Sequence, residues 1–283
     1  MVGEPDRSKE CPVCGCVVLT PTVVRGVPPL LRCSECSLTF RRDTIGGILD
    51  RELDPGELLR LGKSRNALYQ PGLRRFEESR QIGTILDIGS GGGHFARVAG
   101  DLRWRVVALE NSLYLCRTSA RLGTPVVVRG TAFTLPFGPD RFDVVTMWDV
   151  LDHLEQPLPA LQEARRVLRP GGLLYVRVRN GPIHIALRRS VLIPPGASVF
   201  HTLVFSRASL AAALRLAGFD HATVGCARLT TGNPYAEASG FDDFLLRAIK
   251  ATWQGASALV SALTGRRVLL APSIQAVALR PGA

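Results

Sequence analysis

From residue 85 onward, the chain alternates short apolar runs with longer segments whose apolar residues recur at helical spacing. This pattern predicts strands that alternate with helices, as in an α/β fold built on a largely parallel sheet. The strands are expected at residues 85–88, 104–109, 126–128, 141–149, 173–178, 222–227 and 273–279. The helices are expected up to residue 101 and at residues 111–122, 158–168 and 206–217.

A glycine-rich turn, residues 89–93, follows the first expected strand, and a strand, a glycine turn and a helix in succession are typical of nucleotide binding in a doubly wound sheet. The dinucleotide pattern G-x-G-x-x-G fails because His94 occupies its sixth position. Asp87, at the carboxyl end of the strand, would repel a pyrophosphate and attract an ammonium or sulfonium group. The turn therefore predicts S-adenosylmethionine (SAM), which joins a nucleoside to a cationic amino acid.

A second acidic residue, Glu110, ends the second expected strand. It lies 21 residues after Gly89, which matches the acidic residue roughly 20 positions on that binds a ribose diol. The alternative is a solvated carboxylate at a strand end, which is less favoured because the offset fits.

The N-terminal part of the chain contains two C-x-x-C pairs, Cys11 with Cys14 and Cys33 with Cys36, and 18 residues separate them. This spacing is typical of a zinc ribbon, in which four thiolates close a tetrahedron around Zn²⁺. A closed four-cysteine site leaves no open coordination position, so the zinc is expected to be structural. Disulfides or a redox C-x-x-C pair are the less favoured alternatives.

Three regions are expected along the chain: a zinc ribbon at 1–42, a helical linker at 43–82 and an α/β domain at 83–283 with a helical insert at about 232–265. In the linker, Pro71 is expected to break the helix, and Tyr69 is expected either to cover the cofactor or to pack in the core. The apolar stripe of the insert is expected to pack on the sheet; the alternative is a lid over an apolar or lipid-linked acceptor.

The net charge of +11 raises the question of a nucleic-acid partner. All but three of the 35 basic residues are arginine, and they are spread along the chain without a basic block, so nucleic-acid binding is not favoured. No apolar run approaches the roughly 18–20 residues that span a membrane, and the first residues lack the apolar region of a signal peptide. The expected location is the cytoplasm.

Six ordered segments resemble the class I SAM-dependent methyltransferases, and the resemblance covers most of residues 65–230. The segments are residues 86–93, 108–110, 135–137, 142–145, 151–154 and 167–172. The resemblance implies a Rossmann-like sheet of seven strands, to which this chain adds the small N-terminal zinc ribbon. The cysteine module is similar to that of zinc-ribbon methyltransferases acting on sugars, surface glycans or other small metabolites.

The resemblance also assigns the residues that would bind SAM. The methionine end would be held by Asp87, Gly89, Ser90 and Gly91, the ribose by Glu110 with Asn111 beside it, and the adenine would be flanked by Ala132. Trp148 and Asp149 would line both the cofactor and the acceptor. Thr131 departs from the family, which usually has an acidic residue at this position.

Methyl transfer needs a base only if the acceptor must lose a proton, and the candidates are His153 and His201. Asp149, Asp152 and His153 also resemble a metal-linked element of quinone O-methyltransferases. The favoured interpretation is that Asp152 and His153 cap a helix and shape the pocket.

The predicted function is methyl transfer from SAM to a small-molecule, sugar, glycan or lipid-linked acceptor. One alternative is an rRNA or tRNA methyltransferase whose zinc ribbon holds RNA, although Phe40 is the ribbon's only aromatic residue. A second alternative is a zinc protein that binds SAM without catalysis.

Overall fold

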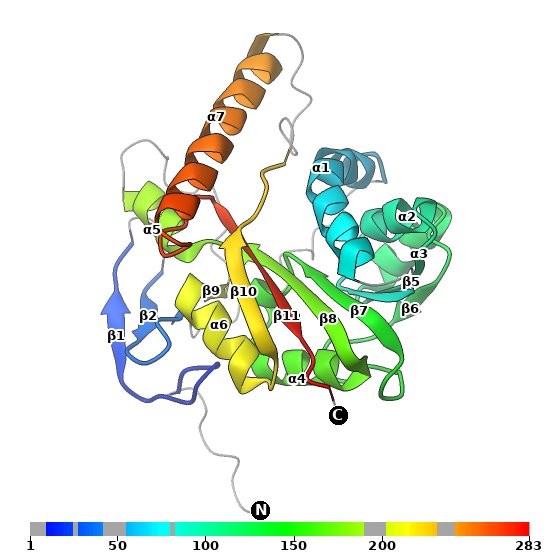
Figure 1. Cartoon of the computed structure of the whole chain (residues 1–283), viewed down its shortest axis with the longest axis horizontal. Helices are drawn as coiled ribbons and strands as arrows, with labels where there is room; N and C mark the ends of the chain where they lie inside the picture. The colour runs from blue at the N-terminus through cyan, green and yellow to red at the C-terminus, as the bar shows by residue number, and fades with distance from the viewer. Residues whose placement is uncertain are drawn as a thin grey trace, which may run out of the picture.

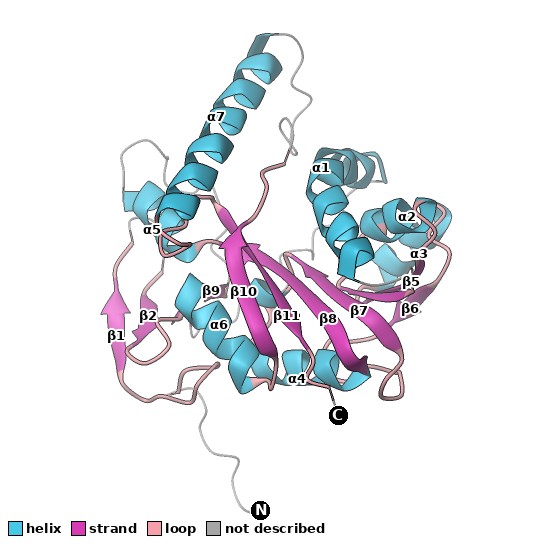
Figure 2. Ribbon diagram, in the orientation of Figure 1, coloured by secondary structure: helices cyan, strands magenta, loops and turns pink. Residues whose placement is uncertain are grey.

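A computed structural model describes residues 10–24, 28–41, 55–79, 83–189, 202–230 and 241–282. Its centre is a sheet of seven strands (Figures 1 and 2). Six of the strands run in the same direction, and β11 runs in the opposite direction. In spatial order the strands are β10 (Asp220–Cys226), β11 (Ser273–Leu279), β8 (Leu168–Arg179), β7 (Phe142–Trp148), β4 (Thr84–Ile88), β5 (Arg105–Glu110) and β6 (Val127–Arg129). The predicted seven-stranded α/β sheet is confirmed.

Helices cover both faces of this sheet. One face packs against α1 (Pro55–Ser79) and α2 (His94–Asp101), and the other packs against α4 (Pro157–Val167) and α6 (Arg207–Leu216). The remaining helices near the sheet are α3 (Leu113–Arg121), which contacts β5 and β6, the short 3₁₀ helix η2 (Leu151–His153) and α5 (Gly181–Arg189). Because strands alternate in side-chain direction, Leu86 faces the α4 side and Ile85 faces the α1 side.

The structure differs from the local expectations at Pro71 and at α5. Pro71 lies inside α1, which continues through it to Ser79, although proline cannot donate the helical hydrogen bond. The burial of Leu68, Leu73 and Phe76 holds both parts of the helix against the sheet and compensates for that loss. The second difference is α5, which was not predicted.

The cysteine module forms its own sheet of four short strands, β1 (Leu19–Thr22), β2 (Leu30–Cys33), β3 (Thr39–Phe40) and β9 (Leu203–Val204). The last strand comes from the α/β part of the chain and pairs with β3, with Thr39 opposite Val204. Leu38 and Phe40 are buried in the same apolar cluster as the face of the central sheet that α4 covers. The module is therefore joined to the sheet by a shared core.

Helix α7 (Phe241–Leu263) rises away from the central sheet (Figure 1). Its apolar stripe was expected to pack on the sheet, and this is wrong, because Phe244 is 69% exposed and Leu259 is 61% exposed. Small side chains form the buried face instead, at Ser257 and Ser261. Within the described ranges, no helix combines the length and apolarity that a membrane crossing requires.

Candidate functional site

The turn after β4 is built to bring backbone close to other elements. Gly89 and Ser90 donate backbone hydrogen bonds to the Leu109 carbonyl at 2.8 and 3.0 Å. Gly89 has a φ of +69°, and a Cβ placed there would lie 2.5 Å from Val150. Gly91 has a φ of +54°, and a Cβ there would meet nothing within 4 Å. The turn is thus packed on one side and open on the other, at Gly91.

Glu110 holds the open side of this turn in place. Its carboxylate accepts backbone hydrogen bonds from Gly91 at 2.9 Å, Asn111 at 2.8 Å and Ser112 at 2.9 Å. The side chain is buried, and the carboxyl end of β5 brings it beside the turn. The hydroxyl of Ser90 is also buried in the turn and has no hydrogen-bond partner within the structure. A fixed carboxylate is therefore bonded to Gly91, and an unsatisfied hydroxyl lies on the preceding residue.

Asp87 lies in β4, between β5 and β7, and is 2% exposed. Its Oδ1 accepts a hydrogen bond from the Thr146 hydroxyl at 2.8 Å. Burial raises the pKa of Asp87 to about 7, and the nearby Glu110 adds to this effect. Among the described basic side chains, none forms an ion pair with it. A cationic ligand beside Asp87 would therefore favour the charged carboxylate.

An aromatic cluster closes the site on the α1 side. The ring of Trp148, at the end of β7, lies 4.9 Å from Tyr69, 5.3 Å from Phe95 and 4.3 Å from Tyr175, measured between centroids. Tyr69 is 3% exposed and packs in this cluster, while its other expected role, covering the cofactor, stays a prediction. These contacts fix α1 against the exit of β7.

Asp149 follows Trp148 in a left-handed conformation with a φ of 57°. Its carboxylate pairs with Arg177 and, at 3.6 Å, with Arg65. Burial alone would raise the pKa of Asp149, but the guanidinium groups of Arg177, Arg65 and Arg179 lower it below the ordinary value. Asp149 is therefore a charged carboxylate that is already neutralised by arginine.

Asp152 and His153 lie in η2, next to Asp149. Burial, and then the charge of Asp149, raise the pKa of Asp152 to about 7, while burial, and then Arg179, lower that of His153 to about 4. Asp149, Asp152 and His153 do not converge as metal ligands, so the geometry favours the pocket-shaping role over the metal-linked one. The capping role expected for Asp152 and His153 is wrong, because the N-cap residues of η2 and α4 are Val150 and Gln156, and neither helix start has a side-chain capping hydrogen bond. His201, the other candidate base, lies outside the described residues.

Ala132 lies after β6 in a short turn that a bridge between Thr131 and Thr134 closes. The preceding Gly130 donates its backbone N–H to the Glu110 carbonyl at 3.0 Å, which ties this turn to the end of β5. The structure thus gathers the predicted residues at the carboxyl ends of neighbouring parallel strands. This edge of an open α/β sheet is where ligands bind.

The sequence interpretation missed three residues of this site. Thr146 and Arg177 are buried polar side chains within apolar strands, and Arg65 comes from α1. A polar residue within a buried strand pattern is the signal that could have identified Thr146 and Arg177, because buried polar groups need partners. Arg65 carries no comparable signal, since an arginine on a helix is ordinarily solvated.

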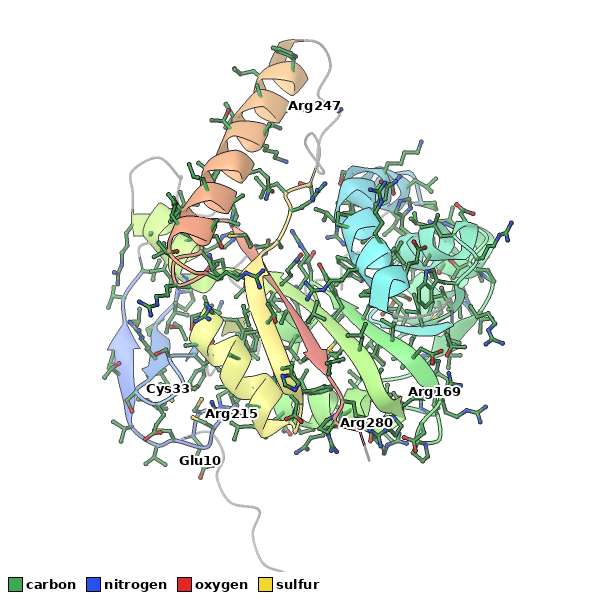
Figure 3. The ribbon with its side chains drawn as sticks, in the orientation of Figure 1. Glu10, Cys33, Arg169, Arg215, Arg247 and Arg280 are labelled. Atoms are coloured by element: carbon green, nitrogen blue, oxygen red, sulfur yellow. The ribbon has the colours of Figure 1, made fainter. Side chains whose placement is uncertain are left out.

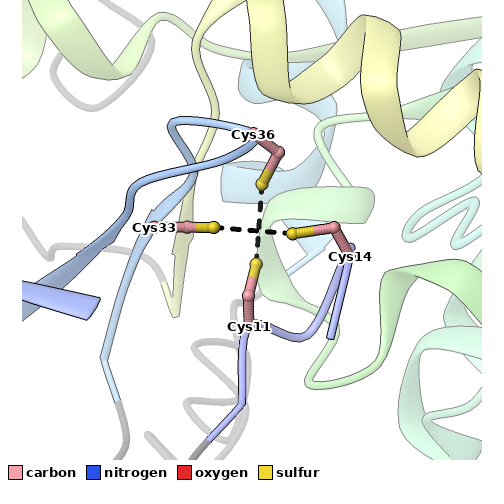
Figure 4. A group of neighbouring side chains, drawn as sticks. All are labelled: Cys11, Cys14, Cys33 and Cys36. Carbon is pink, nitrogen blue, oxygen red and sulfur yellow. Dashed lines mark hydrogen bonds between the residues drawn. The ribbon is translucent and has the colours of Figure 1, made fainter. Parts of the chain in front are cut away.

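The four predicted cysteine ligands come together in the N-terminal module (Figure 4). Their sulfur atoms all lie within 4.8 Å of one another, with 3.5 Å between Cys11 and Cys36 and between Cys14 and Cys33. A Zn–S distance of about 2.3 Å implies about 3.8 Å between the sulfurs of a tetrahedron. The donor set and its spacing therefore fit a tetrahedral zinc ion.

Residues 86–176 match the family model described as a methyltransferase domain. Over 137 residues, the chain is 31% identical to a probable S-adenosylmethionine-dependent methyltransferase of Mycolicibacterium smegmatis, with 48% of this chain and 51% of that protein aligned. It is also 29% identical over 157 residues to a ubiquinone biosynthesis O-methyltransferase of Cereibacter sphaeroides, with coverages of 54% and 55%. The chain thus spans about half the length of these curated relatives.

A solved structure from Thermotoga maritima, a SAM-dependent methyltransferase described as a possible histamine N-methyltransferase, has a similar fold. The TM-score is 0.51 at 21% identity, and the match covers 80% of this chain and 95% of the other. This likeness supports the Rossmann-like methyltransferase fold alone.

Replacing Gly89 by alanine should destabilise the protein and distort the turn. The new Cβ would collide with Val150, and a φ of +69° is unfavourable for any residue with a Cβ. We expect a loss of about 2 kcal/mol in the free energy of unfolding. Adding Val150→Ala should recover the share of the lost unfolding free energy that comes from the collision with Val150. The share that comes from the unfavourable backbone conformation should remain. Urea unfolding of the single and double variants measures both, and equal stability of Gly89→Ala and the parent would contradict the prediction.

Asp87→Asn should change stability in a pH-dependent way. Asp87 has a raised pKa of about 7, so its protonated form is favoured on folding and its contribution to stability falls as the pH rises from about 4 to 7. The lowered pKa values of His94 and His153 act in the opposite direction, but they are common to both proteins. The variant should therefore gain stability relative to the parent across this range, by on the order of 2 kcal/mol. Urea unfolding of both proteins at about pH 4 and at about pH 7 measures the difference in their free energies of unfolding. A difference that is the same at the two pH values would contradict this prediction.

Proposed function

We propose that this chain moves a methyl group from SAM to a small-molecule acceptor, using the domain at residues 86–176. The observation that carries the proposal is the set of Asp87, Gly91 and Glu110, which lies at the carboxyl edge of a methyltransferase-like sheet and within the matched region. A buried acid for a cation, an open glycine and a fixed acid for hydroxyl groups are the features that SAM requires.

The residues fit this donor. The open side of Gly91 leaves room beside Glu110, whose carboxylate is positioned to accept hydrogen bonds from ribose hydroxyls. The buried Ser90 hydroxyl would gain a partner, and Asp87 would gain a cation that favours its charged form. When bound, SAM supplies a methyl group that its sulfonium centre activates for in-line displacement.

The protein's main contribution would be alignment and exclusion of water. The cluster of Trp148, Tyr69 and Tyr175 forms an apolar wall at the exit of β7. Asp149, held by Arg177 and Arg65, supplies a fixed polar edge for an acceptor. Burial lowers the pKa of His153 to about 4, so its imidazole is neutral near pH 7 but a weak base, which suits a pocket-shaping role better than removal of a proton from an acceptor.

The relative named as a ubiquinone biosynthesis O-methyltransferase supports a small-molecule acceptor. We also propose that the four cysteines hold a structural Zn²⁺, since four thiols with tetrahedral spacing leave no coordination position for a substrate. Cys16 does not belong to this set, because its sulfur faces the Ser34 hydroxyl at 3.5 Å.

Incubation of the zinc-loaded protein with methyl-labelled SAM and fractionated cell extract tests the acceptor class. Label in the small-molecule fraction is the expected result. Label in RNA would instead favour the RNA methyltransferase alternative. Tight SAM binding with no label transferred to any fraction would favour the non-catalytic alternative.

A further inference from the structure

A cleft of about 1000 Å³ lies on the same face of the sheet as α1, away from the strand ends that carry Asp87 and Glu110. One wall comes from α1 through Leu68, Pro71 and Arg75, and the opposite wall comes from α7. Its floor is formed by β10 and β11, including Val277. This volume is at the upper end of the range for small-molecule sites.

The charges that line the cleft have one sign. Five basic side chains from α1, α7 and the segments that follow β10 and α7 line it, and none of the described residues that line it is acidic; the five are Arg75, Arg228, Arg247, Lys250 and Arg266. Figure 3 labels Arg247 on α7. Lys250 is held in position because its ammonium donates to the carbonyl and hydroxyl of Thr230, both at 3.1 Å. Guanidinium groups suit phosphate because they donate parallel hydrogen bonds to its oxygens.

The uncharged lining combines aliphatic side chains with polar ones, among them Thr223, Gln254 and Gln275. Leu68, Leu229 and Val277 face the cleft together with several alanines of α7, and the described lining residues include no aromatic ring. Proteins that bind single-stranded RNA stack its bases on aromatic side chains, so this lining does not suit a nucleobase. An alkyl or isoprenyl chain would bury aliphatic surface here without needing a ring partner.

We propose that the cleft between α1 and α7 binds an amphiphile that carries a phosphate group on an aliphatic body. The phosphate would meet the basic side chains and the aliphatic body would cover the apolar lining. The inference rests on the cleft itself and does not depend on methyl transfer. Helix α1 contacts both regions, because Pro71 lines the cleft and a Cβ placed on the neighbouring Gly72 would lie 3.4 Å from the Trp148 ring.

Calorimetry on the zinc-loaded chain of residues 1–283 tests the proposal with dodecyl phosphate below its micelle concentration. We expect saturable binding to one site that weakens as salt is added, because the phosphate contacts are ionic. Inorganic phosphate lacks the aliphatic body, and dodecyltrimethylammonium has the opposite charge, so each should bind at least about tenfold more weakly. Equal affinity for either control would overturn the proposal, as would binding that salt does not weaken.

A pair of variants locates the site. Arg228→Gln with Arg266→Gln should weaken dodecyl phosphate binding by at least about tenfold, since each removes a charge-assisted hydrogen bond. Arg228→Lys with Arg266→Lys should recover part of the affinity, and the matched pair Arg207→Gln with Arg215→Gln on α6 should leave it unchanged. SAM affinity should be unchanged in all three, which also reports intact folding.

The remaining outcomes are decisive as well. Unchanged binding in the Arg228 and Arg266 variants would place the amphiphile elsewhere and overturn the proposal. Binding only to vesicles that contain phosphatidate, with none to dodecyl phosphate in solution, would identify a membrane surface instead. Preferential, salt-sensitive binding of a short RNA that the same variants abolish would identify a nucleic-acid site. If the glutamine variants fail to fold, the comparison of the three probes and the salt dependence on the parent chain still decide the proposal.

Discussion

Replacing Asp87 by asparagine should weaken SAM binding by at least about 30-fold while leaving the protein folded. The carboxylate is 2% exposed and is the buried acid at the site that would face the donor's cationic end. Removing one member of a buried charge pair costs about 2 kcal/mol or more, which corresponds to this loss in affinity. Isothermal titration calorimetry measures the change. The matched control Asp101→Asn, at an exposed position at the end of α2, should bind SAM as the parent does.

The pH dependence of binding separates this role from a structural one. Because the pKa of Asp87 is raised to about 7, its charged form is a minor species below that pH. The apparent affinity of the parent should therefore fall about tenfold between pH 8 and pH 6, since only the charged fraction is competent. The SAM affinity of the Asp87→Asn variant should not show this fall between pH 8 and pH 6, apart from any change that other groups cause. An identical pH profile for the two proteins would contradict the role assigned to Asp87, even if the variant bound weakly.

Removing zinc should destabilise the whole chain and not the cysteine module alone. Leu38 and Phe40 connect the module to the core of the central sheet, and β3 pairs with β9 from the α/β part. Metal binding to four-cysteine sites contributes free energy directly to folding. A loss of about 5 kcal/mol would lower the melting temperature by roughly 10–20 °C for a domain of this size. Thermal melting of Cys33→Ser with Cys36→Ser, monitored by circular dichroism, measures the effect.

A matched control exists within the same chain. Cys16 lies next to the module but outside the ligand set, and Cys226 lies in β10 with its sulfur 3.8 Å from the Ser257 carbonyl. Replacing either by serine should change the melting temperature by only a few degrees, about what 1 kcal/mol produces. Metal content, measured by mass spectrometry, should be one zinc per chain in the parent and in these controls. A fully zinc-free chain with the parent's melting temperature would contradict the structural role.

The positions of the strands in the central sheet could be predicted from the sequence because short apolar runs between amphipathic helices leave a strong pattern. Asp87 and Glu110 could be assigned to the site for the same reason, since each lies at the end of an expected strand. The local errors have physical causes. Pro71 reads as a helix breaker, yet tertiary packing of Leu73 and Phe76 overrides that preference. Helix α5 begins at Gly181-Pro182, a pair that also reads as the end of a strand.

Other features depend on contacts between distant segments, and no local pattern encodes them. Asp149 is paired by Arg65, 84 residues earlier in the chain, and by Arg177 on the neighbouring strand. The cleft between α1 and α7 is lined by both Arg75 and Arg247, although most of the chain separates them in sequence. The apolar stripe of α7 predicted a packed helix, but the small side chains of Ser257 and Ser261 form the buried face instead. Such outcomes follow from tertiary arrangement, which residue spacing alone does not specify.

Calorimetric titration of the zinc-loaded chain with SAM, and separately with a nicotinamide dinucleotide, tests the central claim most directly. We predict saturable binding of SAM that depends on Asp87, and no measurable heat from the dinucleotide, because the carboxylate of Asp87 would repel its pyrophosphate. Binding of the dinucleotide without binding of SAM would contradict the account.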